Sequence, residues 1–175
     1  MSVPFPELPP MTGPWCVGID LSGRSVDIVR LHESHDYAER GQRVLTGATA
    51  FDRLLDIEIP SSGWWSDVYL AAIEMPESRF RVSLRAQLPV YGAVCARIPS
   101  SITLWSVSPA DWKRPLALGA KKPTAASFPP ELAACAADWP QDALDALGVA
   151  LYARDENARG VEAALNPPTG RNQAA

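Results

Sequence analysis

The run from Val68 to Glu74, read VYLAAIE, constrains the fold more than any other stretch of this 175-residue chain. It is apolar almost throughout, ends in an acid and is followed by Met75 and Pro76. Such a run is typical of a parallel strand that other elements cover on both faces, so it predicts an α/β architecture. Glu74 then lies at the carboxyl end of a strand, where ligand sites of open α/β sheets gather. Burying its carboxylate is costly unless a cationic group meets it.

A second strand is predicted for residues 15–20, where large apolar residues alternate with small ones and the run ends in Asp20. This pattern places Asp20 on the less bulky face of the strand, at its end. An alternative role for Asp20 is to initiate the turn that follows, as aspartate often does. A polar loop is expected over residues 32–41. The other predicted strands are residues 26–31, which pair back as a hairpin, residues 42–45 and residues 102–107.

Residues 138–159 predict one helix that carries two acids, Asp142 and Asp145, on one face. Asp138 is a good N-cap, and Gln141 stands three residues later, as in a capping box. Small residues along this segment favour close packing against a sheet, which would bring both acids near the strand ends. The alternative is an ordinary solvated helix face. The predicted packing stripe consists of Leu144, Leu147 and Leu151.

Three further helices are expected over residues 49–56, 78–96 and 130–137. In the second of them, Pro89 should kink the helix or end its first part. Its arginines are expected to point outward, and its apolar side chains inward. The apolar set is Phe80, Leu84, Leu88, Val90 and Tyr91.

Composition predicts a single globular domain over residues 14–165, because the chain is 47% hydrophobic and 21% charged. The four prolines of residues 1–13 indicate a disordered or extended lead-in, and residues 166–175 a disordered tail. We find neither a signal-peptide pattern nor an apolar run of about 20 residues, so no membrane association is expected. The three scattered cysteines, read as small buried apolar residues, favour a reducing cytosol.

The net charge of −4 argues weakly against a nucleic-acid partner until it is divided along the chain. Residues 79–122 hold eight basic residues and one acid, whereas the rest of the chain holds eight basic residues and 19 acids. This asymmetry suits a phosphate-facing surface beside an acidic metal centre. The alternative is a chance cluster on a solvated surface. The eight basic residues are Arg79, Arg81, Arg85, Arg97, Lys113, Arg114, Lys121 and Lys122.

The order of these features resembles the RuvC family of Holliday junction resolvases over about residues 15–159. The matching pieces, in chain order, are Gly18-Ile19-Asp20, a strand ending in Glu74, an arginine-bearing helix, a strand followed by Trp112-Lys113, Gly119-Ala-Lys-Lys122, and Asp142-Ala-Leu-Asp145. The resemblance implies a ribonuclease H-like fold, in which helices flank both faces of a five-stranded mixed sheet. It also implies four acids that hold two Mg²⁺ ions, with Mn²⁺ as a substitute. These acids would be Asp20, Glu74, Asp142 and Asp145, and carboxylate oxygens are ligands that Mg²⁺ prefers.

By the same resemblance, Lys121 or Lys122 matches the phosphate-contacting lysine, and Lys113 is a weaker candidate. Phe80 is the nearest match to an aromatic wedge that stacks on a base, with a core aromatic as its alternative. The implied function is Mg²⁺-dependent, structure-selective cleavage of branched DNA, four-way junctions above all, by a cytoplasmic, nucleoid-associated homodimer of host or phage origin. The expected DNA contacts are Arg79, Phe80, Arg81, Arg85, Lys113, Lys121 and Lys122.

Other classes stay open. The acids alone are compatible with another ribonuclease H-like nuclease or a transposase-type enzyme. A non-catalytic DNA-binding relative is a further alternative, although the presence of all four acids argues against it. The stretch Gly18 to Gly23 is also similar to the first phosphate loop of actin-like sugar kinases and chaperones, but 175 residues supply neither the two lobes nor the second loop of those proteins.

Overall fold

The structure is a computed structural model that describes residues 13–21, 25–44, 62–76 and 81–165. Apart from Gly13, the predicted lead-in lies outside the described residues. The predicted tail over residues 166–175 and the predicted helix over residues 49–56 lie outside them as well.

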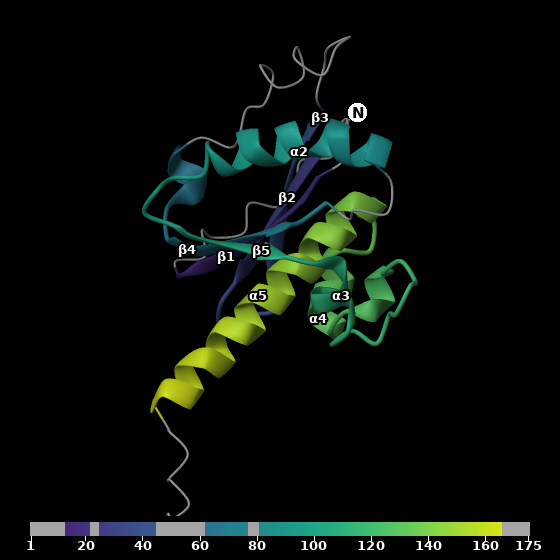
Figure 1. Cartoon of the computed structure of the whole chain (residues 1–175). Helices are drawn as coiled ribbons and strands as arrows, with labels where there is room; N and C mark the ends of the chain where they lie inside the picture. The colour runs from purple at the N-terminus through teal and green to yellow at the C-terminus, as the bar shows by residue number, and fades with distance from the viewer. Residues whose placement is uncertain (1–12, 22–24, 45–61, 77–80, 166–175) are drawn as a thin grey trace, which may run out of the picture.

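A five-stranded mixed sheet in the order β3-β2-β1-β4-β5 forms the centre of the fold (Figure 1). β4 pairs in parallel with β1 and β5, whereas β2 pairs antiparallel with β1 and β3. The predicted parallel strand is confirmed with the predicted bounds. The strands are β1 (Trp15–Leu21), β2 (Ser25–His32), β3 (Ala38–Val44), β4 (Val68–Glu74) and β5 (Thr103–Val107).

The third strand begins earlier than predicted, because β3 starts at Ala38, inside the stretch predicted to be a polar loop. It is an edge strand that pairs with β2, and its charged residues Glu39 and Arg40 are only partly buried, so it needs no apolar pattern there. Arg30 of β2 and Glu39 of β3 form an ion pair of 2.5 Å across the two strands. The polar sequence therefore hid the first part of this strand, residues 38–41.

Helices cover both faces of the sheet (Figure 1). α2 (Arg81–Cys95) lies on one face, and α5 (Gln141–Leu165) lies on the other with the short helices α3 (Pro109–Lys113) and α4 (Pro130–Cys135). Two 3₁₀ turns, Ser62–Trp65 and Ala125–Ser127, complete the described elements. None of the described helices combines the length and the apolar character needed to cross a lipid bilayer.

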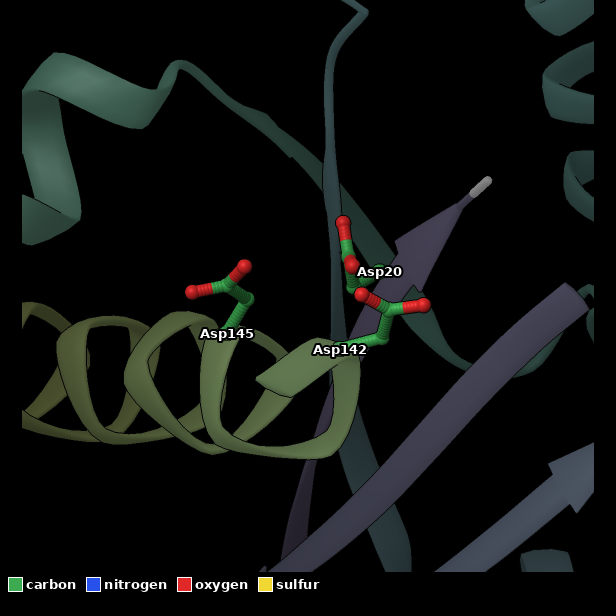
Figure 2. Close-up of side chains that lie close together, drawn as sticks. All are labelled: Asp20, Asp142 and Asp145. Carbon is green, nitrogen blue, oxygen red and sulfur yellow. The ribbon is translucent and has the colours of Figure 1, made fainter. Parts of the chain in front are cut away.

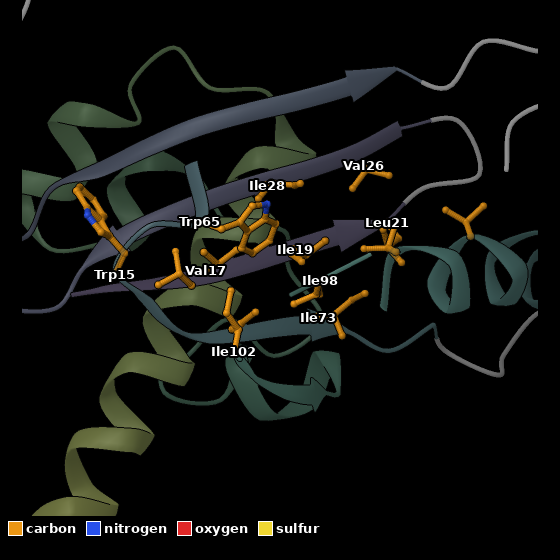
Figure 3. Packing of buried hydrophobic residues seen from close by; sticks show 14 residues of the cluster. Trp15, Val17, Ile19, Leu21, Val26, Ile28, Trp65, Ile73, Ile98 and Ile102 are labelled. Carbon is orange, nitrogen blue, oxygen red and sulfur yellow. The ribbon is translucent and has the colours of Figure 1, made fainter. Parts of the chain in front are cut away.

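Alternation along β1 divides the core into two sides. Trp15, Val17 and Ile19 pack in the cluster that includes Val90 and Val94 of α2, and Figure 3 shows the buried residues of this cluster. The intervening small residues face α5, and Asp20 belongs to this second set. The prediction that Asp20 lies on the less bulky face is confirmed.

α2 excludes one of the two effects predicted for Pro89 and corrects the prediction for Leu88. The helix runs through Pro89 without ending, and Pro89 is exposed, so the backbone carbonyl that lacks a proline N–H partner can be hydrated. Leu88 was predicted to point inward but is 47% exposed. The buried positions are Val90 and Val94, and Leu88 lies about 200° round the helix from Val90. The side chains of Phe80 and Leu84 lie outside the described part of the chain.

α5 begins at Gln141 rather than at Asp138, so the predicted capping box is wrong. The Trp139 N–H donates to the Ala136 carbonyl and closes a turn that follows α4, which leaves the start of α5 to the residues after it. The Gln141 side-chain amide instead donates to the Pro123 carbonyl and to Asp145, both at 3.2 Å. The predicted leucine stripe is buried, as expected.

The cysteines agree in part with their prediction as small buried residues. Cys16 in β1 is fully buried, whereas Cys95 and Cys135 are only partly buried. Cys135 lies on α4, as predicted.

Candidate metal centre

α5 crosses β1 at Gly18, and the missing side chain there permits a close approach. A Cβ built on Gly18 would collide with the Ala146 carbonyl oxygen and the Ala150 amide nitrogen of α5. Because Gly18 and Asp20 lie on the same face of β1, this contact places Asp20 beside the first turns of α5. The predicted close packing of the small-residue helix against the sheet is confirmed.

Three carboxylates meet at this crossing. Asp20, Asp142 and Asp145 each offer one oxygen, and these oxygens lie within 4.8 Å of one another. Figure 2 shows Asp142 and Asp145 projecting from neighbouring turns of α5 beside Asp20 at the end of β1. The two helix acids are three residues apart, so they share one helix face. Two segments more than 120 residues apart in sequence thus build one acidic group.

The electrostatics of this group suit a cation. Burial raises the pKa of Asp20 well above its ordinary value, and the charges of Glu74, Asp145 and Asp142 raise it further. Burial also raises the pKa of Asp145, although the Gln141 amide and two lysines act in the opposite direction. Crowded carboxylates of this kind are stabilised in their ionised form by a hard divalent cation, which prefers oxygen ligands. The residues present therefore fit a divalent-metal site.

Glu74 lies beside this group but is not one of its three members. It ends β4, directly after Ile73, which pairs in parallel with Ile19 of β1, and its charge acts on the pKa of Asp20. The Trp112 indole Nε1 donates to Glu74 Oε2 at 2.5 Å. Glu74 is only partly buried, so its carboxylate is also open to solvent.

The candidate lysines occupy different surroundings. Lys113 and Lys122 are the two lysines whose charges act on the pKa of Asp145. Lys113 is partly buried, with its Nζ 5.0 Å from the centroid of the Trp112 ring. Lys121 and Lys122 are exposed in the loop that precedes the Ala125–Ser127 turn. The structure therefore brings Lys113, the weaker candidate from the sequence, into the electrostatic environment of the acids.

The candidate DNA contacts before β5 are only partly described. Arg79 and Phe80 lie outside the described residues, and the same holds for the side chain of Arg81, which opens α2. Arg85 is exposed on α2. The roles of these four residues stay predictions.

Sequence reasoning missed Asp27. This residue lies directly opposite Asp20 in the β1–β2 pairing, so both side chains point to the same face of the sheet. The Asp27 side chain is fully buried and pairs with Arg40 Nη2 at 3.4 Å. Counting the hairpin register from its turn would have placed Asp27 beside Asp20. Its ion-pair partner Arg40 was harder to find, because residues 32–41 were predicted to be a loop.

A solved structure with a similar fold is that of T. thermophilus RuvC in complex with a Holliday junction substrate. The TM-score is 0.61 at 18% sequence identity, and the match covers 83% of this chain and 96% of that chain. The chain has the ribonuclease H-like fold. The predicted fold class, a five-stranded mixed sheet with helices on both faces, is confirmed. No protein-family model and no curated protein matches the sequence.

Proposed function

We propose that this protein is a divalent-metal-dependent endonuclease that cuts phosphodiester bonds in branched DNA, with residues 14–165 acting as one nuclease domain. The observation that carries the proposal is the group formed by Asp20, Asp142 and Asp145, within 4.8 Å, where β1 meets α5. The Holliday junction substrate of the structurally similar T. thermophilus RuvC supports a four-way junction as the preferred DNA.

In this proposal, Asp20, Asp142 and Asp145 hold Mg²⁺ together with Glu74. Two divalent ions in such a site would activate a water molecule and stabilise the leaving 3′ oxygen of the cut strand. The chain contributes ionised carboxylates held in place by the crossing of β1 and α5. Lys113 and Lys122, whose charges already act on Asp145, would offset the negative charge of the scissile phosphate.

The DNA would extend from the acids over the basic segment, residues 79–122. Arg85, Lys121 and Lys122 are exposed, and Lys113 is partly exposed, so all four are available to phosphates. Arg79, Phe80 and Arg81 remain candidates for the same surface. An overall acidic chain can bind DNA in this way because the local charge of the contact surface decides binding.

Symmetric cleavage of a junction also calls for two copies of the site. One chain carries one acidic group, whereas two symmetric nicks require two sites related by a two-fold axis. We propose that α2 contributes to a homodimer interface. Its Leu88 is 47% exposed, and Met75 just beyond β4 is exposed to the same extent.

Cleavage of defined DNA substrates tests this function. Purified protein with Mg²⁺ or Mn²⁺ should cut a labelled four-way junction faster than a fork, a flap, a duplex or a single strand, and EDTA should stop the reaction. A non-catalytic DNA-binding relative would bind the junction and leave it intact with either metal. Faster cleavage of another substrate would instead indicate a different ribonuclease H-like nuclease.

A further inference from the structure

Trp112 lies between Glu74, at the end of β4, and helix α5, which carries Asp142 and Asp145. Its side chain is fully buried, and its indole Nε1 donates to Glu74 Oε2 at 2.5 Å. A Cβ built on Gly148 of α5 would come into close conflict with Cε3 and Cζ3 of the same ring. Gly148 lies three residues after Asp145, so one aromatic ring contacts both the Glu74 carboxylate and the helix of Asp142 and Asp145.

The short helix α3 holds this ring in place. The Ser108 N–H and hydroxyl donate to the Asp111 carboxylate at 3.2 and 2.6 Å, which fixes the start of α3 directly after β5. Pro109 restricts the backbone at the first helical position. Buried side chains of β1, β4 and α5 surround the ring in a cluster that contains Cys16, Leu70, Ala72, Val149 and Ala153. The ring therefore has little freedom to turn its N–H away from Glu74.

We propose that Trp112 is a positioning residue of the metal centre, which holds the Glu74 carboxylate in the orientation that binds the cation beside Asp20. The inference rests on the proposed function, since it assumes that Glu74 is a metal ligand. A long glutamate side chain at a strand end has several rotamers, and a hydrogen bond from a rigid donor selects one of them. An indole N–H is uncharged, so it orients the carboxylate without neutralising the charge that the cation needs.

The first test replaces Trp112 by Phe, which keeps an aromatic ring against Gly148 but removes the N–H donor. Loss of an outer partner of a metal ligand typically weakens metal binding 10- to 100-fold, so we expect Mn²⁺ affinity of Trp112→Phe to fall by about 10-fold. Mn²⁺ binding is measured by electron paramagnetic resonance of the free ion, without DNA. Trp105→Phe is the matched control, because Trp105 packs at the edge of the same cluster from β5. Its Mn²⁺ affinity should stay within about two-fold of wild type.

A double-mutant cycle separates positioning from packing. In a Glu74→Ala background the side chain that Trp112 orients is gone, so adding Trp112→Phe should change Mn²⁺ affinity by less than about two-fold. A full 10-fold loss in that background would mean that the ring acts only through packing, and would overturn the proposal. Unchanged Mn²⁺ affinity of the single variant would overturn it as well. Wild-type protein that binds Mn²⁺ but cuts no DNA would contradict the proposed function alone, whereas wild-type protein that binds no Mn²⁺ would contradict both.

A measurement on the unsubstituted ring covers the case in which Trp112→Phe does not fold. With ¹⁵N-labelled tryptophan, one indole N–H resonance should shift when Glu74 is replaced by Gln, which assigns it to Trp112. The same resonance should move when Mg²⁺ is added to wild-type protein, and should not move in Asp20→Asn. If no indole resonance responds to Glu74→Gln, or if the assigned one ignores Mg²⁺, the proposal is wrong.

Discussion

At the scale of single residues, Asp145 is the acid whose removal is simplest to interpret. It is partly exposed on α5 and accepts a hydrogen bond from Gln141, which an asparagine carbonyl can also accept. Asp145→Asn should therefore change the free energy of unfolding by less than about 1 kcal/mol. Cleavage should fall more than about 100-fold, because a metal ligand is lost rather than an outer partner. Urea unfolding and junction cleavage check the two values, and equal cleavage by wild type and variant would remove Asp145 from the site.

Asp20 should make the stability of the metal-free protein depend on pH, in a direction that its raised pKa sets. Its pKa is raised in the folded state, mainly by burial, so the folded protein binds a proton there more tightly than the unfolded chain. The contribution of Asp20 to stability is thus greatest below the unfolded value near 3.8 and is lost as pH rises through the folded value. In EDTA, the melting temperature should fall more between about pH 5 and about pH 8 for wild type than for Asp20→Asn. Calorimetry measures the melting temperatures, and parallel pH profiles of wild type and Asp20→Asn would contradict the assignment of this pH dependence to Asp20. Added Mg²⁺ should stabilise only wild type at the higher pH.

At the scale of elements, the approach of α5 to β1 decides whether the acids meet. Gly18→Ala would place a Cβ against the backbone of α5 at Ala146 and Ala150, which cannot move without shifting the helix. We expect a loss of about 1–3 kcal/mol in the free energy of unfolding, together with weaker Mn²⁺ binding, because Asp142 and Asp145 move with α5. Gly92→Ala on α2 is the control, since its Cβ meets nothing within 4 Å. That variant should gain about 0.5–1 kcal/mol and keep its Mn²⁺ affinity. Equal effects of the two substitutions would show that close packing at Gly18 is not needed.

At the scale of the whole molecule, the local excess of basic residues should control DNA affinity in spite of the net charge of −4. Replacing Lys113 and Lys122 by Ala should reduce the slope of log K against log salt by up to about 2, since each lysine that meets a phosphate contributes about 0.9. Fluorescence anisotropy on a four-way junction measures the slope. Arg159→Ala is the control, because Arg159 pairs with Glu156 on a later turn of α5. An unchanged slope in the double variant would mean that both lysines are ordinary solvated surface residues that do not contact DNA phosphates.

The proposed dimer makes a second prediction for the whole molecule. Light scattering at micromolar concentration should give about twice the 18.9 kDa mass of one chain. Leu88→Asp places a charge at the proposed interface and should shift the protein towards monomer. Leu165→Asp adds the same charge at the end of α5, where Leu165 is 75% exposed, and should leave the mass unchanged. A wild-type monomer, or two variants of equal mass, would argue against an interface on α2.

The sequence by itself determined the elements whose signal is local. The apolar run of β4 predicted its two ends correctly, because a strand covered on both faces needs apolar side chains at nearly every position. The spacing of Asp142 and Asp145 likewise placed them on one helix face, since helical periodicity depends only on neighbours in the chain. The start of β3 was predicted wrongly, because an edge strand can form from polar residues that lack an apolar pattern. The start of α5 was predicted wrongly, because a turn that follows α4 occupies the residues before Gln141.

Only the tertiary structure decided how distant residues meet. The distance between Asp20 and the two acids of α5 depends on how closely the helix packs at Gly18, which no local pattern contains. The same holds for Asp27, which is buried beside Asp20 by pairing across the hairpin, and for Trp112, which reaches Glu74 across 38 positions of sequence. Contacts of this kind form when whole elements bury their apolar faces together, so their geometry follows from packing rather than from neighbouring residues.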